Sequence, residues 1–498
     1  MRKSVSIRVV HGILWALALL ALFSCIRVFF FGSMNMPILA FTFSGIKVSL
    51  TLKLDALSTI LFIMISLLAA AIARFAIRYL DGEERQWYFY RYLLLTVIGV
   101  CLFVLSSNLL MLFACWLLTS YGLHQLLLFF PDRADAVNAA RKKALVSRLG
   151  DLALLAGIFL TYDTFHSLEF DRIFEVYNAW PSFRQESTRM EWIVLFFVMG
   201  AMIKSAQFPF HFWLPDTMAT PTPVSAMMHA GIINAGGFLM IRLSPLLQSV
   251  EVGPAVLIIA GATTSVYGAL SMITQSNIKR KLGYSTISQM GMMLFACGLG
   301  AYGVALLHIF AHSFYKAHAF LSTGGLVDEA RKAGFKLRPI GLFGILLGIG
   351  GALAFAYFSF EFENGGRFPY FIYGAVLWLG LVQNTGRSSV GYSYVRVWSV
   401  ILVLMLVAVG LYGLVEHGLG QYLSEVAPAS PSVSGLSPYS ISSLIALGLF
   451  CLGLLLTRSL QRGSSLSRRL YAFLLNGGYF SAASDRFFEK NTPVVREG

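Results

Sequence analysis

The sequence predicts an all-α polytopic membrane protein that crosses the bilayer about fourteen times. Hydrophobic residues make up 57% of the 498 residues and charged residues only 12%. The mean hydropathy of +0.71 lies far above that of soluble domains. Apolar runs of about 20 residues, the length that spans a bilayer as a helix, recur along nearly the whole chain. No stretch long enough for a separate soluble domain lies between them.

The apolar runs give the expected helices in chain order. They lie at approximately 9–32, 55–80, 88–106, 108–130, 144–162, 192–213, 223–245, 252–274, 283–299, 301–327, 338–359, 369–386, 396–415 and 438–458. The first run follows Arg2, Lys3 and Arg8 as a signal sequence does, but it is too long for a typical signal, so we expect an uncleaved first span. An even number of spans places both termini on one side.

Lysine and arginine gather in the loops of one side, which the positive-inside rule makes cytoplasmic. This distribution accounts for the net charge of +14 better than a nucleic-acid partner does. The basic groups are Arg2/Lys3/Arg8, Arg74/Arg78/Arg85/Arg91, Arg133/Arg141/Lys142/Lys143, Lys279/Arg280/Lys281, Arg331/Lys332/Lys336/Arg338, Arg387/Arg396 and Arg458/Arg462/Arg468/Arg469. The loop 416–437, on the opposite side, contains no lysine or arginine. We therefore expect a bacterial inner-membrane protein with both termini in the cytoplasm.

Two segments outside the spans have patterns of their own. Residues 33–53 are rich in β-forming residues and alternate loosely around Ser44 and Gly45, which predicts a small external hairpin. Residues 464–480 carry apolar side chains at helical spacing behind Arg468 and Arg469. This pattern predicts an amphipathic helix that lies on the cytoplasmic interface or docks on a partner.

Five ionisable residues fall inside apolar stretches, where a charge is most costly. They are Lys204, His229, His308, His312 and Lys316. A lysine at the bilayer centre costs roughly 2.5 to 3.5 kcal/mol on insertion scales, so such residues normally face a polar interior and mark an ion path. The chain is therefore interpreted first as an ion-transport protein.

Lys204 precedes Pro209, which must interrupt the helical hydrogen bonds of its span. Backbone groups freed at membrane depth need protein or water partners, so a lysine there has the surroundings of a proton carrier. A lysine that snorkels or pairs with an acid is the alternative. His229, in the next span, is by itself more typical of a hydrogen-bonded core histidine, and its meaning depends on its neighbours.

His308, His312 and Lys316 are spaced four residues apart, which places all three on one helix face. Two histidines one turn apart allow a metal site, but no third ligand is evident, and they cannot bind opposite faces of one haem iron. A row of proton-exchanging groups fits the spacing better. No nucleotide-binding motif appears, so this subunit is not expected to use ATP, and we expect no cofactor in this chain.

Four stretches carry a resemblance to a known family. They are SRLGD at 147–151, KSAQFPFHFWLPDTMATPTPVSAMMHA at 204–230, NIKRKLGYSTISQMG at 277–291 and HIFAHSFYKAHAFLSTG at 308–324. They resemble the proton-conducting membrane subunits of respiratory complex I and of Mrp-type cation/proton antiporters. The resemblance implies an antiporter-like fold of two inverted five-helix repeats, each with a broken helix, and a line of buried charges.

The family also implies roles for individual residues. The lysine matching Lys204 switches protons in the first half, and the histidine matching His229 bridges onward. Residues matching His308, His312 and Lys316 form the central relay. The resemblance therefore implies an ion-translocating subunit that is not itself an enzyme.

Two positions depart from the family pattern. Leu117 stands where the family usually has a glutamate, and Asp151 or His124 is a candidate replacement. For Asp151, a local ion pair with Arg148 is an equally good explanation.

The second departure lies in the second broken helix. Phe360 stands where the family often has a lysine. The neighbouring Glu361 and Glu363 are candidates for the outer half of an ion path. If they do not fill that role, the chain does not conduct as complex I does.

The short length, altered charges and C-terminal tail look most like the DabB-type membrane subunits of DAB inorganic-carbon accumulation complexes. That resemblance implies a large cytoplasmic, zinc-dependent, carbonic-anhydrase-like partner of the DabA type, driven by flow of protons or sodium ions. A complex I-like or Mrp subunit and a non-conducting membrane anchor remain the alternatives. We expect residues 1–53 to form a first helix and hairpin, 54–415 the conducting core, and 416–498 a last span and cytoplasmic tail.

Overall fold

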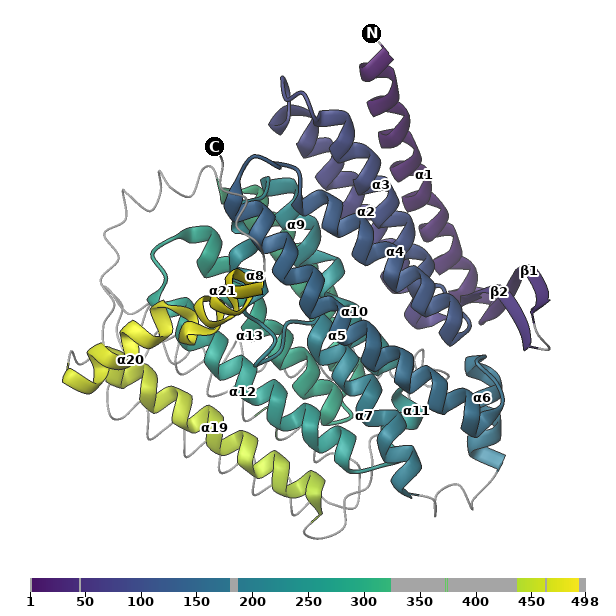
Figure 1. Ribbon diagram of the computed structural model, residues 1–498. Helices are drawn as coiled ribbons and strands as arrows, with labels where there is room; N and C mark the ends of the chain where they lie inside the picture. Colours follow the sequence, from purple (N-terminus) through teal and green to yellow (C-terminus); the bar gives the residue numbers. More distant parts are fainter. Residues whose placement is uncertain are drawn as a thin grey trace, which may run out of the picture.

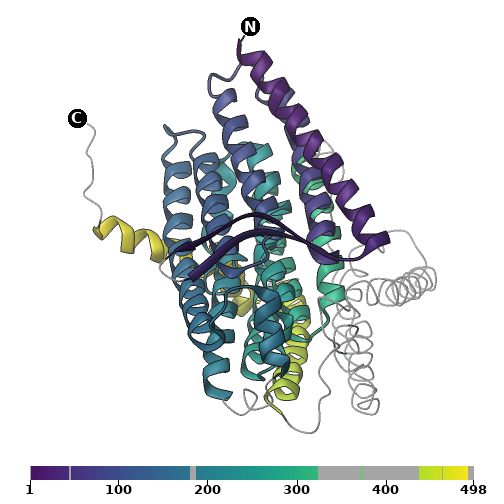
Figure 2. The same ribbon diagram turned by 90° about the vertical axis from the view of Figure 1, so that its right-hand side faces the viewer.

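The computed structural model describes residues 2–43, 46–179, 187–323, 437–461 and 464–491, together with residues 372 and 374. Long helices run roughly side by side and form one bundle (Figures 1 and 2). Eight helices within the described ranges are long and apolar enough to cross a membrane. The prediction of a polytopic helical protein is confirmed, while the expected spans at 338–359, 369–386 and 396–415 lie outside the described residues apart from 372 and 374.

The first part of the bundle consists of α1 (Arg2–Phe31), α2 (Ala56–Tyr79), α3 (Gln86–Val104), α4 (Leu109–Leu127) and α5 (Ala134–Phe165). Helix α1 lies at the edge of the bundle against α2, and its exposed face carries Leu19, Phe23 and Phe30. Apolar side chains also cover the outer face of α5, where Phe159 is 68% exposed. Such faces suit contact with lipid tails.

The middle of the chain is broken into shorter pieces. These are α6 (Phe170–Ala179), α7 (Ser187–Lys204), α8 (Trp213–Asp216), η2 (Thr217–Ala219), α9 (Thr222–Ala230), η3 (Ile232–Asn234), α10 (Ala235–Arg242) and α11 (Ser244–Leu247). The expected span at 192–213 therefore ends at Lys204, before the predicted proline break. The expected span at 223–245 is interrupted around Gly231, which the prolines Pro223 and Pro245 at its two ends do not indicate.

Helices α12 (Val252–Thr274), α13 (Ile278–Gly298), α14 (Tyr302–Leu321) and α19 (Pro438–Gln461) complete the bundle. Helices α12 and α13 approach closely because glycines line their contact. A Cβ added to Gly261 would lie 2.6 Å from the backbone nitrogen of Phe295, and one on Gly291 would lie 2.5 Å from that of Ser265. Helix α19 runs along α12 on the opposite side (Figure 1).

The predicted hairpin is present as β1 (Met34–Phe43) and β2 (Ile46–Leu54), paired antiparallel with a bulge between Pro37 and Leu39. It crosses one flank of the bundle near α6 (Figure 2). Asn35 donates a hydrogen bond of 2.9 Å to Asp171 of α6, and Lys53 forms an ion pair with the same carboxylate. Partial burial by itself raises the pKa of Asp171, but these two bonds outweigh it and hold the pKa below its ordinary value.

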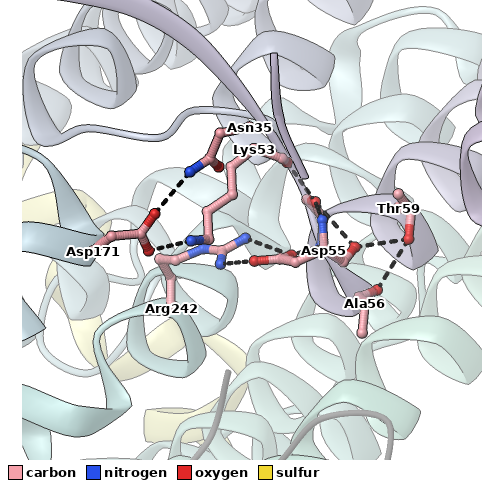
Figure 3. Close-up of polar contacts among 8 residues, drawn as sticks. Asn35, Lys53, Asp55, Ala56, Thr59, Asp171 and Arg242 are labelled. Atoms are coloured by element: carbon pink, nitrogen blue, oxygen red, sulfur yellow. Dashed lines mark hydrogen bonds and ion pairs between the residues drawn. The ribbon is translucent and has the colours of Figure 1, made fainter. Parts of the chain in front are cut away.

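A buried ion pair ties the base of the hairpin to the middle of the bundle (Figure 3). Asp55 accepts a hydrogen bond from the Ser58 backbone nitrogen, which caps α2, and both of its oxygens pair with Arg242 at the end of α10. The Asp55 and Arg242 side chains are each only 2% exposed. One carboxylate therefore fixes the start of α2 and the end of α10 at the same point.

The C-terminal segment forms α20 (Ser465–Leu475), η5 (Gly477–Tyr479) and α21 (Phe480–Asn491). The amphipathic helix expected at 464–480 is confirmed as far as Leu475. It ends there because Gly477 and Gly478 adopt positive φ angles of 61° and 65°, which terminate a right-handed helix. Helix α21 then lies beside α8 (Figure 1). Its Asp485 forms an ion pair with Lys142 of α5.

Candidate functional site

The break after Lys204 is held open by side chains that satisfy the backbone groups left free. Ala206 has a positive φ of 49°, and Pro209 cannot donate a hydrogen bond. The Phe208 backbone nitrogen donates to the Thr264 hydroxyl at 3.0 Å, and the Ser205 hydroxyl donates to the Ile233 carbonyl at 2.8 Å. Helix α7 thus ends inside the bundle without exposing its last turn to lipid.

Lys204 is buried, at 8% exposure, and within the described residues its side-chain nitrogen has no hydrogen-bond partner. The nitrogen lies 4.4 Å from the centre of the Trp116 ring, a cation–π contact. The same ring donates a hydrogen bond of 2.8 Å from Nε1 to Asp151, which also pairs with Arg148 at 3.0 Å. Asp151 thus makes the local ion pair with Arg148 and also contacts the lysine site through Trp116, a geometry that fits both interpretations.

Two small cavities border Lys204, each of about 20 Å³, enough for one water molecule. The first has a chiefly apolar lining that includes Trp116, Asn234 and Ile309. The second is lined by Lys143, Ser147 and Trp213 among others. Lys204 therefore lies between two spaces through which a proton could pass on single waters.

His229 lies in α9 with none of its surface exposed. Its Nδ1 is 3.0 Å from the Thr286 hydroxyl, and its ring stacks on Phe320 at 4.6 Å between centres. Within the described residues Nε2 has no partner. The histidine is hydrogen-bonded, as a core histidine is, but one nitrogen remains available for a proton.

Helix α14 carries the predicted row of three. The His308 and His312 rings are 6.0 Å apart and nearly parallel, with 16° between their planes. Lys316 is fully buried and donates a hydrogen bond of 3.1 Å to the Leu282 carbonyl of α13. His312 lies within electrostatic reach of His229, His308 and Lys316, so α9 and α14 bring these four together.

Lys204 is connected to this group through uncharged side chains. Asn234 lines the first cavity beside Lys204 and donates a hydrogen bond of 2.8 Å to the Ser313 hydroxyl, next to His312. Asn234 and Ser313 were absent from the sequence prediction, because polar uncharged residues in a span carry no distinctive signal. Glu361 and Glu363, predicted for the outer half of the path, lie outside the described residues.

Two lysines lie in a different environment from the expected basic loop. The apolar run begins only at 144, but α5 begins at Ala134 and buries the side chains of Lys142 and Lys143 to 5% and 3% exposure. A signal was present in the spacing, because Lys143, Ser147 and Asp151 follow each other at four-residue intervals and share one helix face.

Comparison with known families agrees with this arrangement. The family model described as "NADH:quinone oxidoreductase/Mrp antiporter, TM" matches residues 106–360, and that described as "NADH-Ubiquinone oxidoreductase (complex I), chain 5 N-terminus" matches residues 41–90. The first match covers half of the chain and contains every predicted path residue except Glu361 and Glu363, which follow directly after it.

Two relatives illustrate the similarity. A protein named "Probable inorganic carbon transporter subunit DabB2" from Halothiobacillus neapolitanus is 41% identical over 293 residues, which are 59% of this chain and 53% of the relative. The NADH-ubiquinone oxidoreductase chain 5 of Chondrus crispus is 33% identical over 394 residues, 75% of this chain and 58% of the relative. The chain thus spans little more than half the length of these relatives.

Solved structures show the same fold. A chain of the Mrp complex from Dietzia sp. DQ12-45-1b superposes with a TM-score of 0.63 at 23% identity, covering 100% of this chain and 61% of the other. A chain of the membrane-bound sulfane sulfur reductase, an archaeal respiratory membrane complex, superposes with a TM-score of 0.57 at 19% identity. The match covers 95% of this chain and 93% of the other. The predicted antiporter-like fold is confirmed, and the chain belongs to the NADH:quinone oxidoreductase/Mrp antiporter family of membrane proteins.

Proposed function

We propose that this chain is the proton-conducting membrane subunit of an energy-coupled inorganic-carbon uptake complex. One observation carries the conducting role: Lys204 is buried at an interrupted helix, has no hydrogen-bond partner within the described residues, and borders two water-sized cavities. A lysine in such a place accepts and releases protons without first breaking a hydrogen bond to another protein group. His229, His308, His312 and Lys316 continue the path, and Asp151 supplies the negative charge beside its start.

The inorganic-carbon assignment draws on relatives named as inorganic carbon transporter subunits, of which three are 36% to 41% identical to this chain. We propose that the basic loops and both termini face the bacterial cytoplasm. A large zinc-dependent, carbonic-anhydrase-like partner docks there and carries out the chemistry. Downhill flow of protons, or of sodium ions, through this chain then favours one-way hydration of CO2 to bicarbonate in the partner.

Complementation of a deletion strain tests the role of Lys204. A strain lacking the gene and carrying Lys204→Ala should fail to grow at low CO2, whereas Lys281→Arg, which keeps the charge of an exposed lysine on α13, should restore growth. Membrane levels of both variants need to match the wild type. Full rescue by Lys204→Ala contradicts the conducting role.

A subunit of a complex I-like pump or Mrp antiporter is the second candidate, favoured by the 75% of this chain that aligns with chain 5 of Chondrus crispus. Purification of the assembled complex distinguishes the two candidate functions. Co-purification of one large zinc protein supports the uptake complex, and co-purification of quinone-reducing or small antiporter subunits supports the second candidate. If uncouplers leave the assembled complex fully active, the chain is a non-conducting anchor instead.

A further inference from the structure

Two consecutive lysines of α5 have opposite surroundings. Lys142 forms ion pairs with Asp216 at 2.7 Å and with Asp485 at 2.6 Å. Lys143 forms no ion pair within the described part of the chain, although it is the more deeply buried of the two. A buried charge without a counter-ion is costly, so its presence calls for an explanation other than packing.

The hydrogen bonds of Lys143 fix its side chain in place but provide no negative charge to balance its own. Its side-chain nitrogen donates to the Ser120 carbonyl at 2.9 Å and to the Ser120 hydroxyl at 2.8 Å. The Ser120 hydroxyl is in turn 3.1 Å from that of Ser147. An ammonium group has three N–H donors, so these two bonds leave one for another acceptor.

The same water-sized cavity is lined by Lys143, Ser147 and Lys204. Helices α5 and α7 cross closely at Gly150, where an added Cβ would lie 3.0 Å from Ile203, and at Gly200. Lys143 lies two turns before Gly150, towards the start of α5. The two lysines thus face one cavity, with Lys143 on the side where α5 begins.

The charges around this cavity are unbalanced. Arg148 and Lys204 are within electrostatic reach of Lys143, and among the described residues only the carboxylate of Asp151 opposes these positive charges. His124 of α4 also interacts with Lys143. Two buried ammonium groups that face one space repel each other strongly, so the pair favours a single shared proton.

We propose that Lys143 is a second proton-carrying lysine, which passes protons through the water-sized cavity to Lys204. This inference rests on the proposed conducting function and extends the path towards the start of α5. The N–H bond of the charged Lys143 breaks and its proton joins the cavity water, while that water releases another proton to the neutral amine of Lys204. Lys143 is left neutral and takes up a new proton from water on the side where α5 begins.

Proton flux into membrane vesicles that hold the full-length chain in its complex, driven by an imposed pH gradient, tests the assignment. Lys143→Met removes the carrier, and Lys143→Arg keeps the charge and the donors to Ser120 but cannot release a proton. Both variants should lower the flux by on the order of tenfold or more. Arg141→Lys, which keeps the charge of an exposed neighbour on the same helix, should conduct like the wild type.

A variant that leaves Lys143 in place guards against misfolding as the cause. Ser147→Val fills the cavity and should also lower the flux, while thermal unfolding confirms that each variant is folded. Wild-type flux in Lys143→Arg with loss of flux in Lys143→Met would show that Lys143 is only a structural hydrogen-bond donor and would overturn the proposal. Wild-type flux in both variants would overturn it as well. Lys204→Ala in the same vesicles tests the proposed conducting function separately from the role of Lys143. Undiminished flux in Lys204→Ala would contradict the conducting function itself.

Discussion

The side-chain nitrogen of Lys204 lies 4.4 Å from the centre of the Trp116 ring. That ring also donates a hydrogen bond to Asp151, so the lysine and the carboxylate are held on one indole from different helices. This arrangement supplies a negative charge near Lys204 although Leu117 provides none. The acid has a different position from the one the family pattern indicates, and an aromatic ring lies between it and the lysine.

Replacement of Asp151 by Asn should lower proton flux by roughly tenfold, because each 1.4 kcal/mol of lost stabilisation of the charged lysine is one factor of ten. The flux assay in vesicles measures this directly. Trp116→Phe keeps the ring over Lys204 but loses the bond to Asp151, so its flux should fall between those of the wild type and Asp151→Asn. Equal flux in all three would show that Asp151 does not serve Lys204.

The Asp55–Arg242 ion pair should contribute strongly to folding. Arg242→Ala leaves a buried carboxylate without its partner, which typically costs about 3–5 kcal/mol. Thermal unfolding of the detergent-purified protein should show a large drop in midpoint. The double variant Asp55→Asn with Arg242→Gln has no buried charge and should recover part of the loss. A double variant as unstable as Arg242→Ala alone contradicts the charge argument.

Acid should weaken the attachment of the hairpin. The pKa of Asp171 lies below its ordinary value of about 4, so its contribution to stability is present above that pH and is lost as pH falls through the folded pKa. The unfolding midpoint of the wild type should therefore fall as pH decreases from 5 towards 3. In Asp171→Asn this fall should be smaller. Identical pH profiles would show that Asp171 does not hold the hairpin to α6.

Close packing of α12 on α13 should tolerate no side chain at Gly261. A Cβ there lies 2.6 Å from a backbone atom, which cannot move aside as a flexible side chain can. Gly261→Val should therefore destabilise the protein by roughly 1–3 kcal/mol, the usual cost of overpacking. Gly448→Val in α19 is the matched control, because nothing lies within 4 Å of its added Cβ. Unfolding midpoints of the two variants make the comparison.

Much of this arrangement could be predicted from the sequence because apolar length and proline position act locally. The run at 252–274 coincides with α12, and Pro209 indicated the break beside Lys204. The spacing of His308, His312 and Lys316 sufficed to place them on one face of α14. These predictions needed no knowledge of what lies beside each helix.

The other parts of the site depend on contacts between segments distant in the sequence. Asp55 and Arg242 are 187 residues apart, and nothing local indicates that they meet. Lys143 looked exposed because charged residues at the edge of an apolar run normally are, but the first turns of α5 pack into the bundle. The interruption at Gly231 likewise reflects packing between helices, since the prolines of that span lie only at its ends, Pro223 and Pro245.

The turn of α5 that carries Lys142 and Lys143 contacts two different parts of the protein. Consecutive residues of a helix point about 100° apart, so Lys142 is tied to α21 while Lys143 faces the interior cavity. A displacement of α21 that pulled on Asp485 would rotate or shift that turn, and the cavity side would move with it. The C-terminal helix is thus mechanically joined to the space between the two lysines by a single peptide unit.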